Sequence, residues 1–472
     1  MKKFDAVIIG SGQAGNPLAK RLSVEGRSVA LVESDWVGGS CVNYGCTPTK
    51  TWVGIAKKVA HARKAQKYGI KLSKEMPDFV LVQQQKDEVV SNSREGLKDS
   101  LTEDPNITLF HGKGSFTGYK EIHVRSGDSR THSISGNRVF INTGVRPHIP
   151  EIEGLSSVKY YTSRSILDIE KRPEHLLIIG GGYIALEFSQ IFRRMGSRVT
   201  VVEQESRLLP MEDDDVGQMV TEILESDGVK IITNGTAGRV TSAQDGSVDA
   251  VIESEGQSFK ITATHLLIAT GTVPNTEDLN LNKTGIEVDV KGYIPVNSHL
   301  ETSEAGIYAL GDVKGGPAFT HVSYNDYLVV ADHLFGDHTA SIQDRMIPYC
   351  LFIDPELGRI GITEKEAREQ NLDFSVAKLN TSSIARAIET EETTGFIKAV
   401  VDNTTKRVLG VSAICAIGGE FMSFLQLAML GRLTYEQLRD TMFSHPTYAE
   451  AMNTLFSESN IKPGFDHDSS QG

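Results

Sequence analysis

Half of the cysteines in this chain lie in one short segment, GGSCVNYGCTPTKTW, at residues 38–52. Two thiols with four residues between them, Cys41 and Cys46, could be inert, bind a metal or form a redox pair. Zinc needs four ligands, and no CxxC or HxxxH pair accompanies them, which disfavours a zinc site. Cys350 and Cys415 stand alone in β-type runs, where a small buried side chain is typical. We therefore predict a redox pair and no metal centre.

The residues after the second cysteine indicate how this pair is activated. Thr47 is a suitable helix N-cap, and Pro48 suits the first helical position. Cys46 would then lie at a helix N-terminus. The helix dipole lowers the pKa of a thiol there, and the thiolate is the reactive form.

Three glycines near the N-terminus have the spacing of a phosphate-binding turn. Gly10, Gly12 and Gly15 follow the β-type run DAVII and precede a helical pattern. The first allows a tight turn, the second lets the backbone approach a pyrophosphate, and the third allows close helix–strand packing. Glu33 ends the next β-type run, where an acid can bind ribose hydroxyls. This pattern predicts a dinucleotide site.

A second copy of this pattern begins near residue 180. Gly180 and Gly182 follow the run HLLII, Ala185 takes the third position, and Glu203 ends the next run. An acid there binds the 2′-hydroxyl of NADH and repels the 2′-phosphate of NADPH. Arg207 lies close enough in sequence to weaken that preference, so NADPH is a second candidate.

The elements around these motifs predict an α/β fold with two Rossmann-like dinucleotide-binding domains and a C-terminal α+β domain. Between the two glycine motifs, residues 51–67 and 79–101 have helical patterns. After residue 343, the runs RMIPYCLFID, GFIKAVVD and RVLGVSAIC predict strands, and helices follow. The polar segment from residue 459 predicts a flexible tail.

Charge and composition limit the possible partners and location. A net charge of −13 argues against nucleic acid as a main partner. No apolar run reaches the roughly 18 residues that a membrane-spanning helix needs, and the first residues lack the pattern of an export signal. We therefore expect a cytoplasmic protein that does not insert into a membrane, where a disulfide is usually catalytic or sensing.

Together these motifs resemble the class I pyridine nucleotide–disulfide oxidoreductases. The resemblance covers residues 3 to about 457 and includes GGSCVNYGCTPTK, GGGYIALE, ATGTVPN, GIYALGD and HPTYAE. It implies an FAD domain from residues 1–149 and 271–342, an NAD(P) domain at 150–270, a dimerisation domain at 343–458 and a tail at 459–472.

The resemblance also implies which residues bind the two dinucleotides. The expected FAD positions are Gly10, Gly12, Gly15, Glu33, Ser40, Lys50, Gly114, Thr143 and Asp312. The expected NAD positions are Gly180, Gly182, Tyr183, Glu203 and Gly271. Tyr183 matches a position that gates the nicotinamide pocket in some members, and Lys50 matches a lysine near the flavin ring, with Glu187 as its partner.

The catalytic roles follow from the same resemblance. It implies that NADH reduces the flavin, that Cys46 is the flavin-proximal charge-transfer thiol, and that Cys41 is the interchange thiol that attacks the acceptor. His445 matches the catalytic base and Glu450 the carboxylate that orients it. In the family this pair reaches the site from the partner subunit, which implies a homodimer.

The choice of acceptor is the open part of this prediction. The segment GGPAFTHVSYNDYLVV at 315–330 resembles the mercuric-reductase-like branch that contains a cupric reductase, so Cu(II) or another metal ion is the leading acceptor. The alternatives are a dihydrolipoamide dehydrogenase, another disulfide reductase, or a flavin-bearing sensor without substantial turnover. Whether His321, Tyr324 or Asp326 contacts a metal is left open.

Overall fold

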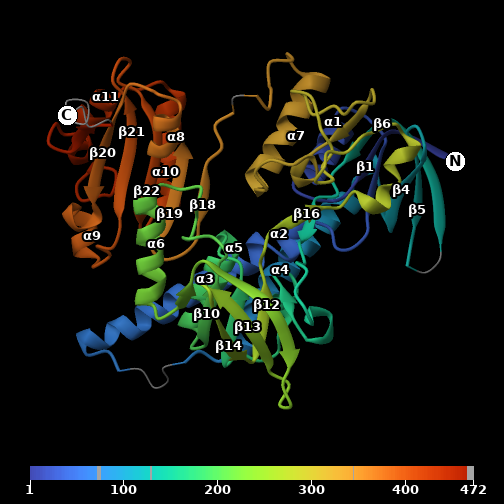
Figure 1. The fold of residues 1–472 in the computed structure, drawn as a ribbon. Coiled ribbons are helices and arrows are strands. Elements are labelled where there is room, and N and C mark those ends of the chain that lie inside the picture. Colours follow the sequence, from blue (N-terminus) through green and yellow to red (C-terminus); the bar gives the residue numbers. More distant parts are fainter. Residues whose placement is uncertain (72–75, 128–129, 344, 465–472) are drawn as a thin grey trace.

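The computed structural model describes residues 1–71, 76–127, 130–343 and 345–464. Its first sheet combines the N-terminal strands with one strand contributed much later in the chain (Figure 1). The strand order is β3-β2-β1-β6-β5-β4, and β17 pairs in parallel with β6. The members are β1 (Lys2–Ile9), β2 (Val29–Glu33), β3 (Ile107–His111), β4 (Lys113–Gly118), β5 (Glu121–Arg125), β6 (Thr131–Ile141) and β17 (Ile307–Ala309).

A second parallel sheet repeats the strand–helix–strand unit of the first. Its order is β11-β10-β9-β15-β8, and a three-stranded antiparallel sheet, β12-β13-β14, accompanies it. Both glycine motifs therefore follow the first strand of a parallel βαβ unit, as the sequence predicts. The strands are β8 (Tyr161–Thr162), β9 (His175–Ile179), β10 (Arg198–Val202), β11 (Lys230–Ile232), β12 (Gly235–Ser242), β13 (Val248–Ser254), β14 (Gln257–Ala263) and β15 (His265–Ile268).

Two short antiparallel strands join these two parts of the chain. They are β7 (Val145–Pro147) and β16 (Thr272–Pro274), which lie just before and just after the second nucleotide unit. The chain leaves the first sheet through β7 and returns through β16 to reach β17. The boundaries at 149/150, 270/271 and 342/343 stay predictions.

The C-terminal part forms a six-stranded antiparallel sheet in the order β18-β19-β22-β21-β20-β23. The strands are β18 (Tyr349–Leu351), β19 (Glu356–Gly361), β20 (Phe374–Asn380), β21 (Phe396–Asp402), β22 (Val408–Cys415) and β23 (Ile461–Pro463). Because β23 pairs with β20, the predicted flexible tail is wrong for its first residues. Residues 465–472 lie outside the described part of the chain.

The helices cover these sheets and connect them. The longer ones are α1 (Gly15–Val24), α3 (Cys46–Lys64), α4 (Phe79–Thr102), α5 (Tyr183–Arg194), α6 (Asp214–Ser226), α7 (Thr320–Phe335) and α10 (Gly418–Leu430). The shorter ones are α2 (Gly39–Asn43), α8 (Glu364–Glu369), α9 (Ala385–Glu389), α11 (Tyr435–Asp440) and α12 (Ala451–Leu455). Among the described residues, no helix is both long and apolar enough to cross a membrane.

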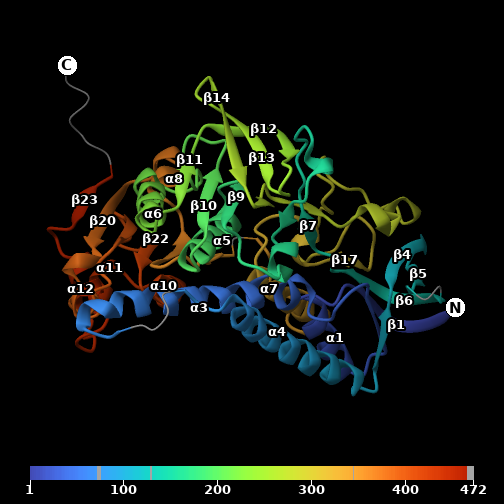
Figure 2. The same cartoon turned by 90° about the horizontal axis from the view of Figure 1, so that it is seen from below.

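Helix α3 connects the redox segment to the C-terminal domain (Figure 2). Its first turn carries Cys46, and further along Lys57 forms an ion pair with Asp354 at 3.2 Å, while His61 lies 3.9 Å from Glu392. The buried Trp52 anchors the middle of the helix, with Phe79, Phe188 and Phe192 around its ring. Contacts therefore hold the helix around Trp52 and in its C-terminal half.

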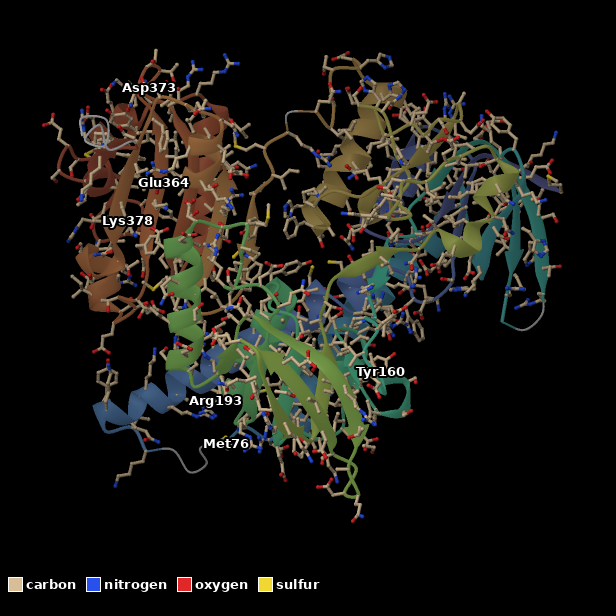
Figure 3. The ribbon with its side chains drawn as sticks, in the orientation of Figure 1. Met76, Tyr160, Arg193, Glu364, Asp373 and Lys378 are labelled. Carbon is tan, nitrogen blue, oxygen red and sulfur yellow. The ribbon has the colours of Figure 1, made fainter. Side chains whose placement is uncertain are left out.

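A buried lysine fixes the second nucleotide unit against the C-terminal sheet. Lys398 of β21 is 4% exposed and lies 2.9 Å from Asp213 and 2.8 Å from Asp215 at the start of α6, and 3.1 Å from Glu364. Lys378 of β20 also donates to Asp215, at 2.6 Å; Figure 3 labels Lys378 on the C-terminal sheet and Glu364 at the start of α8. Three carboxylates therefore offset the cost of burying the Lys398 ammonium.

Candidate active site

The thiols of the predicted redox pair contact each other where two helices meet. Cys41 lies in α2, Cys46 begins α3, and both are free thiols whose side chains hydrogen-bond to each other. The pKa of Cys46 is lowered to about 6, chiefly by the hydrogen bond from Cys41, with further contributions from the Thr320 hydroxyl and the Lys50 ammonium that act against burial. The same bond raises the pKa of Cys41. Near neutral pH the reduced pair therefore holds one proton and one negative charge.

The helix behind Cys46 begins earlier than the sequence predicts. Cys46 does lie at the helix N-terminus, as expected, but Gly45 is the N-cap, and the predictions of Thr47 as N-cap and Pro48 as first helical residue are wrong. The Thr49 amide donates to the Gly45 carbonyl at 3.1 Å, so the first helical turn closes two residues earlier than predicted. Pro48 is tolerated as the third helical residue because that amide would have no helical partner. The helix ends at Lys64, short of the predicted residue 67.

The predicted lysine–glutamate pair forms one turn beyond Cys46. The Nζ of Lys50 lies 2.6 Å from a carboxylate oxygen of Glu187 on α5, and Glu187 is buried. The backbone amide of Phe352 donates to the same carboxylate at 3.0 Å, and Lys50 lies 4.7 Å from the centre of the Phe352 ring. Three separate segments therefore fix one positive charge near the redox pair.

The first glycine loop has the shape that a pyrophosphate-binding turn requires. Gly10 has φ of +107°, and a Cβ there would lie 2.2 Å from the carbonyl oxygen of Asn142. A Cβ at Gly12 would lie 2.8 Å from the Asn142 side chain, and one at Gly15 would lie 2.3 Å from the Gly10 carbonyl. The buried Glu33 accepts the Ser11 amide at 2.8 Å at the same loop. These contacts fit the FAD site that the resemblance implies.

The other expected FAD positions surround this loop. Ser40 lies exposed on α2, beside Cys41 in sequence, and Gly114 packs against the ends of β1 and β2, where a Cβ would lie 3.2 Å from Ile9. The hydroxyl of Thr143 donates to the Asn275 carbonyl at 2.9 Å. Burial raises the pKa of Asp312 to about 6.

The second glycine loop repeats this geometry. Gly180 has φ of +109°, and a Cβ there would lie 2.4 Å from the carbonyl oxygen of Ala269, whereas Gly182 faces open space. The Gly181 amide donates to the buried Glu203 carboxylate. An acid therefore lies at the position that would meet the adenosine ribose.

Neighbouring residues complete this second site. Arg207 donates to the carbonyls of Pro210 and Glu212, at 2.9 and 3.0 Å, and lies 2.9 Å from Asp214. Its guanidinium is therefore held by the segment that leads into α6 and by the first residue of that helix. Tyr183 begins α5, with its ring 5.9 Å from that of Phe319. Gly271 has φ of +105° with open space where a side chain would lie.

The predicted base and its carboxylate also pair in the structure. Nδ1 of His445 lies 3.0 Å from an oxygen of Glu450, and the imidazole is 72% exposed. Exposed apolar residues lie on the same domain: Leu427 and Leu430 on α10, and Met442 three residues before the histidine.

The residues left open as metal contacts have other partners. Nε2 of His321 lies 2.6 Å from the Pro348 carbonyl oxygen, Tyr324 is exposed, and the fully buried Asp326 holds Arg345 at 2.7 Å. Within the described ranges, no group of three or more histidine, cysteine or acidic side chains is arranged to hold a metal ion. Cys415 is buried, as expected, whereas Cys350 is only partly buried.

Two residues with direct contacts to this region are missing from the predicted site. The Asn142 side chain accepts the Gly15 amide at 3.0 Å and donates to the Leu310 carbonyl at 2.8 Å. The hydroxyl of Thr320, the first residue of α7, lies 3.2 Å from Sγ of Cys46. Both contacts join segments more than 100 residues apart, so no local motif indicates them.

Comparison with known proteins places this geometry in a family. Residues 4–326 match the pyridine nucleotide-disulphide oxidoreductase family, and residues 347–456 match the dimerisation domain of that family. The chain is 38% identical to the probable pyridine nucleotide-disulfide oxidoreductase RclA of Escherichia coli, over 97% of this chain and 99% of that protein. It is 35% identical to a mercuric reductase of Staphylococcus aureus, over 95% of this chain and 81% of that protein.

Solved structures agree with these matches. The Cu(II) complex of the HOCl-induced flavoprotein disulfide reductase RclA from Escherichia coli has a TM-score of 0.89 and 37% identity, covering 97% of this chain and 99% of that one. A dihydrolipoyl dehydrogenase of Thermus scotoductus is 33% identical over 96% of both chains. The chain belongs to the pyridine nucleotide-disulphide oxidoreductase family, as an FAD-dependent, NAD(P)H-using flavoprotein disulfide reductase of the type that includes RclA and the mercuric reductases.

Proposed function

We propose that this enzyme uses NADH to reduce Cu(II) through the Cys41–Cys46 pair. Oxidation of the dithiol to the disulfide releases two electrons and two protons, and the two electrons convert two Cu(II) to two Cu(I). The main support is the thiol pair itself: a Cys46 pKa of about 6 leaves a single proton on the reduced pair near neutral pH, and once Cys41 gives up that proton its thiolate is a strong ligand for soft metal ions. A second support is that the related RclA is known as a Cu(II) complex.

The two thiols would have different roles in electron transfer. When bound, FAD accepts hydride from NADH and passes electrons to the disulfide. Cys46, at the start of α3 with Lys50 nearby, would be the thiol on the flavin side. Cys41 retains its proton in the reduced pair and would be the thiol that meets the acceptor. The buried Glu187 fixes the position of the Lys50 ammonium, which favours negative charge at Cys46 and at the flavin ring.

The remaining positions would hold the dinucleotides. Gly10, Gly12 and Gly15 would bring the backbone to the FAD pyrophosphate and Glu33 would bind its ribose. Ser40, Gly114, Thr143 and Asp312 would contact the rest of the FAD. In the second unit, Gly180, Gly182 and Gly271 would border the NADH, with Tyr183 covering the nicotinamide pocket.

The coenzyme is expected to be NADH rather than NADPH. The Glu203 carboxylate would repel a 2′-phosphate, and Arg207 is held by Pro210, Glu212 and Asp214, so its guanidinium is engaged elsewhere and does not offset this repulsion. We expect kcat/KM for NADH to exceed that for NADPH by roughly 10²-fold, and Glu203→Arg to narrow this difference. Steady-state kinetics with both coenzymes test this. An NADPH preference in the wild type would contradict it.

The general base would come from a second copy of the chain. His445 is paired with Glu450 but exposed, and apolar side chains on the same domain are also exposed, which is the arrangement expected of an unpaired half of a homodimer. In the dimer, Glu450 would hold Nδ1 so that Nε2 can take a proton from the partner's Cys41.

The first experiment is anaerobic NADH oxidation with Cu(II) as acceptor. We expect rapid formation of Cu(I) by the wild type. In Cys41→Ser the rate of Cu(I) formation should fall at least about 10²-fold, because the remaining thiol has no partner with which to form the disulfide. Cys415→Ser removes a buried thiol of the C-terminal sheet and should retain the wild-type rate. Equal rates in wild type and Cys41→Ser, or no turnover with copper but turnover with lipoamide or another small disulfide as acceptor, would reject the copper proposal.

A further inference from the structure

The clearest unassigned contact to the redox pair comes from α7. Oγ1 of Thr320 lies 3.2 Å from Sγ of Cys46, although the two residues are 274 positions apart. Thr320 is the first residue of a 16-residue helix, and Phe319 is the N-cap. A sulfur–oxygen distance of this size is that of a hydrogen bond.

The start of α7 is held in place by aromatic stacking. The ring of Phe319 stacks on the ring of Tyr349, with 5.7 Å between ring centres and 7° between ring planes. It also stacks on the ring of His321, with 5.3 Å between centres and 10° between planes. His321 is also 2.6 Å from the Pro348 carbonyl oxygen, and Tyr349 bonds to the buried Glu212. These contacts flank Thr320 on both sides, so they hold the backbone that carries its hydroxyl beside Cys46.

The charges that face Cys46 act against one another. Lys50, on the same helix, favours the thiolate. Glu187 and Tyr183 on α5 and Asp312 before α7 carry or can acquire negative charge, which disfavours it. Besides Lys50, two hydrogen bonds favour the thiolate: those from Cys41 and Thr320. Cys41 stops donating when it gives up its proton to react, whereas a threonine hydroxyl keeps its proton throughout.

We propose that Thr320 is a catalytic residue whose hydroxyl donates a hydrogen bond to the Cys46 thiolate and stabilises it while Cys41 is engaged with the acceptor. This inference rests on the proposed role of Cys46. The hydroxyl transfers neither proton nor electron. It keeps Cys46 ionised, and thus able to attack Cys41 again and to interact with the flavin, at the step when its other donor is lost.

The test is a pH titration of the thiolate in the two-electron-reduced holoenzyme. Ionisation is followed by the long-wavelength charge-transfer absorbance and, independently, by the rate of alkylation with iodoacetamide. Thr320→Val replaces the hydroxyl with a methyl group of similar size and should raise the midpoint by about one pH unit, a roughly tenfold change in the ionisation constant. Thr320→Ser should restore the wild-type midpoint. Thr51→Val is the matched control, because that hydroxyl donates to the Thr47 carbonyl and should leave the midpoint unchanged.

The possible outcomes separate this inference from the proposed function. An unchanged midpoint in Thr320→Val, at wild-type flavin content, would overturn the role of Thr320, as would an equal shift in Thr320→Ser. A wild-type enzyme without any thiolate titration would overturn this inference together with the proposed role of Cys46. A wild type that titrates normally but does not reduce copper loses only the copper proposal, and the comparison of the Thr320 variants still decides the inference.

Discussion

The oxidised Cys41→Ser holoenzyme is expected to show a charge-transfer absorbance without added NADH, and its acceptor turnover to fall roughly 10²-fold or more. Without Cys41, Cys46 cannot form the disulfide and remains an electron-rich thiolate next to Lys50. Because the thiolate forms above a pKa of about 6 and is protonated below it, the band should appear as the pH rises through this region. Replacing the Cys41 donor by a serine hydroxyl will shift the pH midpoint at which the band appears, but the band will still grow as the pH rises.

The Cys46→Ser variant tests which thiol lies on the flavin side and which one meets the acceptor. Cys46→Ser should lack both the charge-transfer band and acceptor turnover, since the thiol on the flavin side is gone. In both variants, rapid-mixing experiments should show flavin reduction by NADH at the wild-type rate, because hydride transfer precedes the thiol chemistry. A band in Cys46→Ser and none in Cys41→Ser would reverse the assignment.

Replacing His445 by glutamine is expected to lower turnover with a disulfide acceptor by roughly 10²- to 10⁴-fold, the usual contribution of a general base. Glutamine retains a polar side chain but cannot take the proton from Cys41. Glu450→Gln should have a smaller effect, because it weakens only the orientation of the imidazole at Nδ1. Flavin reduction by NADH, measured separately, should not change in either variant.

Mixed dimers test whether this base acts across the subunit boundary. Homodimers of Cys41→Ser or of His445→Gln should each retain no more than about 1% of wild-type turnover. If the base comes from the partner, a mixed dimer has one intact site, and random mixing of equal amounts should restore roughly a quarter of wild-type activity. If His445 serves its own subunit, no mixture will regain activity.

The parts of the site that lie close together in sequence were predictable. Gly10, Gly12 and Gly15 form one turn, and a β-strand before them and an acid after the next strand leave few alternative structures. His445 and Glu450 are five residues apart, so one motif contains both partners of the pair. Local chemistry determines these arrangements, and the structure shows each of them.

The residues that were not predicted depend on the tertiary structure. Asn142 reaches the first glycine loop only because β6 lies next to β1, and Thr320 reaches Cys46 only because α7 packs over the redox segment. The error at Thr47 has a local cause: a threonine and a proline together are typical of a helix start, but Gly45 already accepts the first helical hydrogen bond. Pairing with β20 makes a strand of Ile461–Pro463, in a segment whose composition is typical of a tail.

Helix α3 sets a limit on how this enzyme can change over evolution. One uninterrupted helix of 19 residues, about 28 Å long, carries Cys46 at its start and Lys57 and His61 at their contacts with the C-terminal domain. One inserted residue would turn everything beyond it by about 100° and advance it by about 1.5 Å, which would take Trp52 or Lys57 out of register. Relatives should therefore differ in the side chains of this helix but not in its length. Insertions should instead be found in surface loops outside α3.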